Sequence, residues 1–133
     1  MAKKINYFYA VGRRKNASCR VRLFKGKGEN TVNEISLEKV FPGEINKIIL
    51  SKPFSLTETT DKYYFSARVL GGGKKSQLDA LILALARALI KVNPKFRSFL
   101  KKGGLLTRDA RERERRMVGM GGKSRRAKQS PKR

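Results

Sequence analysis

The stretch S-Q-L-D-A-L-I-L-A-L-A-R-A-L-I-K-V, residues 76–92, predicts the helix around which the fold is built. Its apolar side chains recur three or four positions apart, the spacing of one helix face: Leu78, Leu81, Ile82, Leu85, Leu89 and Val92. Ser76 with Asp79 three residues later resembles a capping box. Asn93-Pro94 ends the helix. We expect this apolar stripe to be the seed of the core rather than a ligand site.

Outward from this helix, four segments have the alternation or the β-branched and aromatic content of strands. They are Ile5–Val11, Ser18–Phe24, Thr31–Ile35 and Lys62–Leu70. In the second of them Cys19 and Val21 share one side while Arg20 and Arg22 share the other, so we expect a half-buried strand with a cationic outer face. Short helices are predicted at Leu37–Phe41, at Glu44–Leu50 (apolar face Ile45, Ile48 and Ile49, ended by Pro53) and at Phe96–Leu100.

The charge balance is strongly basic throughout. The 133 residues contain 33 Lys or Arg and 10 Asp or Glu, a net charge of +23. Residues 1–100 carry 20 basic and 7 acidic side chains, and residues 101–133 carry 13 and 3. Both parts are therefore cationic, which predicts a polyanionic partner such as nucleic acid. The length suits one domain followed by a tail.

The last nineteen residues, from Arg115 to Arg133, contain eight basic residues, three glycines and no acidic residue. Too little apolar surface is present to offset the entropy of ordering them. We expect this segment to be disordered alone and to order against a polyanion. The preceding R-D-A-R-E-R-E-R-R, residues 108–116, could form one or two helical turns through Asp109–Arg113 and Glu112–Arg116 pairs.

The sequence contains no recognisable set of catalytic residues. The chain has no His, the usual general base, and a single Cys, so neither a zinc site built from Cys and His nor a disulfide framework is expected. Cys19 is either an inert core thiol or a reactive thiol beside arginines. Gly71-Gly72-Gly73 before a helix could hold a phosphate, but the Walker spacing is absent, so a tight turn is the better interpretation. We expect no enzyme and no cofactor.

The remaining function classes are distinguished by their partners. Clusters of basic residues throughout the chain favour backbone and shape recognition of folded RNA. The alternatives are a nucleoid-type DNA-compacting protein and a peripheral membrane binder. The tail lacks apolar wedges to insert into DNA, and its glycines interrupt any amphipathic membrane helix. With no signal peptide and no apolar run long enough to span a bilayer, the chain is expected to be soluble and intracellular, without membrane or DNA partners and not a homo-oligomer.

Five segments resemble the universal small-subunit ribosomal protein nine family in its bacterial or organellar form. They are G-R-R-K-N-A-S-C-R-V-R (residues 12–22), G-K-G-E-N-T-V-N (26–33), the glycine turn at 71–73 with A-R-A-L (86–89), G-L-L-T-R-D-A-R-E-R-E-R-R (104–116, with Arg116 in place of the family's Lys) and K-S-R-R-A-K-Q-S-P-K-R (123–133). The chain departs from the family pattern at Lys74–Ala80, and its last six residues lack the usual Phe.

This resemblance implies an α+β fold: a small four-stranded sheet with helices packed on one face, followed by a long extended basic C-terminal tail. It implies a globular RNA-binding domain at 1–102 and a tail at 103–133 that orders on RNA. The implied partners are small-subunit rRNA in the head, neighbouring head proteins and the anticodon stem-loop of peptidyl-site tRNA, in a cytoplasmic or organellar ribosome. The tail end, Lys132 and Arg133, would approach the tRNA. The implied rRNA-binding residues are Arg13, Arg14, Lys15, Arg20, Arg22, Lys74, Lys75, Arg108, Arg111, Arg115, Arg116, Lys123, Arg125 and Arg126.

Overall fold

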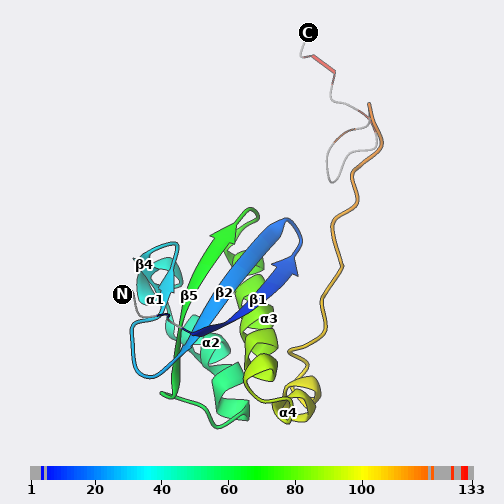
Figure 1. Ribbon diagram of the computed structural model, residues 1–133. Helices are drawn as coiled ribbons and strands as arrows, with labels where there is room; N and C mark the ends of the chain where they lie inside the picture. The colour runs from blue at the N-terminus through cyan, green and yellow to red at the C-terminus, as the bar shows by residue number, and fades with distance from the viewer. Residues whose placement is uncertain (1–3, 5, 120, 122–126, 128–129, 132–133) are drawn as a thin grey trace.

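A single sheet with helices on one face forms the body of the protein in the computed structural model, which describes residues 4, 6–119, 121, 127, 130 and 131 (Figure 1). The elements in chain order are β1 (Tyr7–Arg14), β2 (Ala17–Lys25), β3 (Thr31–Val32), β4 (Ile35–Ser36), α1 (Leu37–Val40), α2 (Glu44–Leu56), β5 (Tyr63–Leu70), α3 (Lys74–Val92) and α4 (Phe96–Lys102). The strand order is β1-β2-β5-β3-β4. β1, β2 and β5 pair antiparallel, and β3 pairs parallel to β5. The predicted α+β class is confirmed, with five strands instead of four.

The additional strand arises because the predicted strand 31–35 is a two-residue-turn hairpin. Asn33 and Glu34 have φ values of 51° and 67°, the left-handed conformation that a tight hairpin turn needs at both central positions. The Asn33 side chain donates to the Val69 carbonyl at 3.0 Å and accepts from the Val69 N–H at 2.8 Å. This side chain therefore fastens the hairpin to β5.

The first hairpin extends further than its sequence pattern indicated. Gly12, Arg13 and Arg14, which follow the predicted end of the strand at Val11, continue β1, and the turn is formed by Lys15 and Asn16. β1 is an edge strand, and two cations of α3 bind its backbone. Arg87 donates to the Val11 carbonyl at 2.8 Å, and Lys91 donates to the Tyr9 carbonyl. Because these acceptors are satisfied, the edge is a poor template for another strand.

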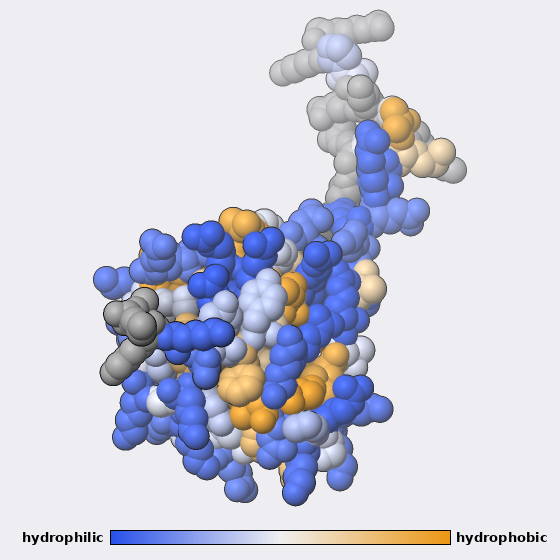
Figure 2. Space-filling model, in the orientation of Figure 1, coloured by the Kyte–Doolittle hydropathy of each residue, from blue (hydrophilic) through white to orange (hydrophobic). Residues whose placement is uncertain are grey.

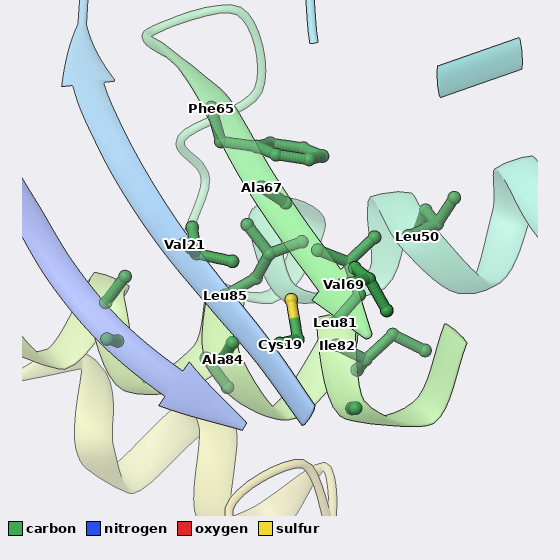
Figure 3. Close-up of a cluster of buried hydrophobic side chains, with 14 of the residues drawn as sticks. Cys19, Val21, Leu50, Phe65, Ala67, Val69, Leu81, Ile82, Ala84 and Leu85 are labelled. Carbon is green, nitrogen blue, oxygen red and sulfur yellow. The ribbon is translucent and has the colours of Figure 1, made fainter. Parts of the chain in front are cut away.

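The predicted central helix is confirmed as α3, and it lies against the sheet (Figure 1). Figure 3 shows Leu81 and Leu85 among Val21, Phe65 and Val69 of the strands. The prediction of a capping box at Ser76 and Asp79 was wrong. α3 begins at Lys74 after Gly73 with no side-chain cap, so both residues lie inside the helix. Cys19 is buried in the same cluster, and burial raises the pKa of its thiol to about 12. It is therefore a core residue and not a reactive thiol.

Small residues allow β1 to approach α3 closely. Gly12 faces the helix backbone, and a Cβ added there would lie 2.0 Å from the Ala80 carbonyl oxygen and 2.6 Å from the Ala84 nitrogen. Ala80 and Ala84 are themselves fully buried. The contact is backbone against backbone, so no side chain can move aside to make room.

The helix α2 differs from its prediction in length and orientation. It continues through Pro53 to Leu56. Of the predicted apolar face, the side chains of Ile45 and Ile48 are 73% and 68% exposed, and only Ile49 packs against the core. Leu50 and Pro53 are buried instead, and Phe54 packs against the core. Positions 50, 53, 54 and 57 also have helical spacing. The Thr57 hydroxyl donates to the Pro53 carbonyl at 2.9 Å, which supports the last turn.

Candidate nucleic-acid interface

Two turns place basic side chains together at the end of the sheet where β1 and β5 end. Gly71 and Gly72 have φ values of 74° and 64°, which favour glycine. A Cβ on Gly71 would lie 2.5 Å from the Asn16 carbonyl oxygen. The β5–α3 turn therefore packs directly against the β1–β2 turn, which agrees with the tight-turn interpretation of the three glycines.

These turns, with the chain that follows α4, form what we term the strand-end surface. Its members are the predicted residues Arg13, Lys15, Lys74, Lys75, Arg108 and Arg111. Arg13, Lys15, Lys74, Lys75 and Arg111 are exposed, and Arg108 is half-buried. The packing of the two turns and the contacts of Arg14 thus bring the segments that carry these cations to the same end of the sheet. The Lys74 ammonium lies 5.9 Å from the centre of the Phe41 ring.

Arg14, also predicted to bind rRNA, is turned inward and holds the chain after α4 onto the domain. Its side chain is 14% exposed. The guanidinium donates to the Arg111 carbonyl at 2.5 Å and lies 3.4 Å from the Asp109 carboxylate. A third contact, at 3.8 Å, joins it to Asp79 of α3. Arg14 therefore links α3, through Asp79, to the chain that follows α4, through Asp109 and Arg111.

The predicted helical turns at 108–116 were wrong, because these residues have no regular structure. Asp109 accepts from the Arg111 N–H at 3.1 Å and from its guanidinium at 2.7 Å. A side chain that binds the backbone in this way competes with helix formation. Hydrogen bonds from the Arg111 guanidinium and N–H, together with the charges of Arg111 and Arg14, hold the pKa of Asp109 well below its usual range.

The described part of the tail has two sections. Leu105 and Leu106 pack against the core, and the Leu105 N–H donates to the Leu100 carbonyl at 3.1 Å. From Glu112 to Gly119 the side chains are exposed and the chain leads away from the domain (Figure 1). Arg115 and Arg116 belong to this second section. The predicted residues Lys123, Arg125, Arg126, Lys132 and Arg133 lie outside the described residues.

The face of the sheet opposite α3 is not covered by any described helix; its strands pass in front of α3 in Figure 1, and its surface is seen in Figure 2. We term it the open face. Arg20 and Arg22 are exposed on it, as predicted. The alternation of the strands adds Tyr7, Tyr9, Phe24, Tyr64, Ser66 and Arg68.

Aromatic side chains on the open face come from three strands, which is why no single strand revealed them. The register places Tyr7 beside Phe24 and Phe24 beside Tyr64. The ring centres are 5.8 Å and 5.1 Å apart, respectively. The Arg22 guanidinium lies 5.2 Å from the centre of the Tyr7 ring. Arg68 was also missed, although its alternation with Ala67 and Val69 could have indicated an outward side chain.

Other kinds of site are not evident in the described part of the chain. No group of three or more His, Cys, Asp or Glu residues there could hold a metal ion. None of the described helices has the length and hydropathy needed to cross a bilayer. The fold and its surfaces thus define a class: a small basic α+β protein with cationic surfaces suited to a polyanion.

Comparison with known proteins identifies the family within that class. The pattern of the family described as ribosomal protein S9/S16 matches residues 12–133. The small ribosomal subunit protein uS9 of Maridesulfovibrio salexigens is 44% identical over 122 residues, covering 92% of each chain. That of Amoebophilus asiaticus is 47% identical over 110 residues, covering 83% of this chain and 86% of the relative. The chain therefore belongs to the ribosomal protein S9 family, whose members are structural and not enzymatic.

Proposed function

We propose that this chain is a structural constituent of the small ribosomal subunit and binds the rRNA of the subunit head during translation. The observation that supports the proposal is the strand-end surface, where the two turns pack against each other and Arg14 holds the chain after α4 at the same end of the sheet. Phosphates neutralise such a surface and release counterions, which drives affinity. Similarity over 83–92% of this chain to proteins named as small-subunit components supports the same assignment. The protein then acts in the ribosome, in the cytoplasm of a bacterial-type cell.

The tail is proposed to continue this interface. Residues 103–111 are held on the domain by Arg14 and by the packing of Leu105 and Leu106. The remainder, beyond Arg111, orders on RNA and carries Lys132 and Arg133 toward the anticodon stem-loop of peptidyl-site tRNA. These 22 residues, 112–133, span roughly 70 Å when extended, which is long enough to link two separate RNA sites. Neighbouring head proteins complete the set of partners.

Sucrose-gradient sedimentation of a cell extract tests the assignment. The protein, detected by an antibody or an epitope tag, is expected to migrate with small subunits and with whole ribosomes at moderate salt. Nuclease treatment that degrades DNA but spares RNA should leave this migration unchanged. Recovery of the protein away from the small subunit, in the DNA or membrane fractions, would contradict the proposal.

A further inference from the structure

A hollow of about 320 Å³ lies on the open face. Arg20, Arg22, Arg68 and Tyr9 line it together with Ser66, and the β3–β4 turn of Asn33 and Glu34 forms part of its wall. It is separate from the strand-end surface, because these residues belong to the middle of the strands and not to their ends.

The register creates an unusual arrangement of charge in this hollow. Arg20 of β2 is directly opposite Arg68 of β5, and Arg22 is opposite Ser66. Like charges directly opposite on neighbouring strands are destabilising. In the described part of the chain, neither Arg20 nor Arg68 has a carboxylate within ion-pair distance, although Glu34 lines the same hollow. In the protein alone, no ion pair among those residues compensates this repulsion.

We propose that the hollow binds a phosphodiester group of the RNA, held between Arg20 and Arg68. Two guanidinium groups can each direct a pair of N–H donors at phosphate oxygens, and the Ser66 hydroxyl offers another donor. The bound phosphate removes the repulsion between the two arginines. This inference rests on the proposed function, since it assigns a second contact surface to the same rRNA partner.

The proposal predicts opposite effects of one substitution on stability and on binding. Arg68→Gln should raise the melting temperature of the free protein by about 1–4 °C, because it removes the like-charge pair. The same variant should weaken binding of rRNA by about fivefold to tenfold. The slope of log affinity against log salt should fall by about 0.7–0.9, the contribution of one phosphate.

The experiment titrates the full chain and its variants into a transcript of the subunit-head rRNA at several salt concentrations. Arg97→Gln is the matched control, since it removes one exposed arginine from α4 in the helical layer. Glu34→Gln, which removes the one acidic side chain among the described residues that line the hollow, should strengthen binding. Melting of each free variant provides the second readout.

The outcomes separate the two proposals. A wild-type chain that binds the head transcript no better than an unrelated RNA of equal length would overturn the proposed function, and this inference with it. Selective wild-type binding with equal affinities for Arg68→Gln and Arg97→Gln would overturn the phosphate site alone. A lower melting temperature for Arg68→Gln would also overturn it, because Arg68 would then be a stabilising residue of the sheet.

Discussion

Gly12 illustrates how much of the molecule depends on a single missing side chain. In the sequence it follows the predicted strand Ile5–Val11 and begins a segment that resembles the family, but the structure places it in β1 against α3. Its role could not be predicted locally, because the atoms that it must accommodate belong to Ala80 and Ala84. By contrast, the burial of Cys19 and the exposure of Arg20 were predictable, since alternation along a strand is a property of neighbours in sequence.

Gly12→Ala is expected to destabilise the protein by about 1–3 kcal/mol or more, because overpacking a contact between two backbones forces β1 and α3 apart. Urea denaturation followed by circular dichroism measures the change. Gly73→Ala is the control, because its added Cβ meets no atom within 4 Å. We expect a loss below about 1 kcal/mol there, from the weaker helix cap. Equal losses at the two positions would show that the close approach at Gly12 is unimportant.

At the scale of elements, the long helix was predictable and the short ones were not. α3 contains enough repeats of its apolar stripe to fix both its type and its buried face. α2 contains two sets of residues with helical spacing, one around Ile45 and Ile48 and one around Leu50 and Pro53, so its orientation depends on contact with α3 and the sheet. The chain after α4 was predicted as helical from its charge pairs, but tertiary contacts with Arg14 give it another conformation.

Arg14→Gln is expected to release this chain from the domain without unfolding the sheet. The variant removes the ion pairs with Asp79 and Asp109 and weakens the hold on the Arg111 carbonyl. Limited trypsin digestion at neutral pH should then cleave after Arg108 and Arg111 several times faster than in the wild type.

Arg13→Gln is the matched control for this digestion, because Arg13 is exposed and lies on the opposite side of the same strand. Its cleavage rates and melting temperature should equal those of the wild type. If Arg14→Gln is cleaved no faster than Arg13→Gln, then the packing of Leu105 and Leu106 is sufficient to hold the segment.

At the scale of the whole molecule, the sequence predicted the partner class better than the geometry of the interface. Net charge and its spread over both parts of the chain required no structure to interpret. The packing of the β5–α3 turn against the β1–β2 turn and the pairing of Arg20 with Arg68 depend on tertiary contacts and strand register, neither of which is visible in a one-dimensional pattern. The basic composition therefore predicts a polyanionic partner, whereas the positions of the basic side chains on the surface depend on the fold.

Deleting Ser130–Arg133 is expected to leave folding and subunit assembly intact, because the core lies within residues 10–100. Binding of tRNA at the peptidyl site should weaken by the equivalent of one or two phosphate contacts. Filter binding of tRNA to purified small subunits that carry the shortened chain measures this loss. The double variant Lys132→Gln/Arg133→Gln keeps the length and should reproduce the loss. Failure of the shortened chain to enter the subunit would contradict the proposed division between domain and tail.

The hydrogen bond from Arg14 to the Arg111 carbonyl affects how fast the tail can reach its proposed RNA site. It fixes the point from which the remaining 22 residues, 112–133, start their search for a partner. Once the domain has docked on RNA, the tail can reach only sites that lie within its own extended length of Arg111. The second encounter is then intramolecular, with an effective concentration that tethers of this kind raise to about the millimolar range. Under the proposed function, docking of the body thus brings the terminus close to its RNA target.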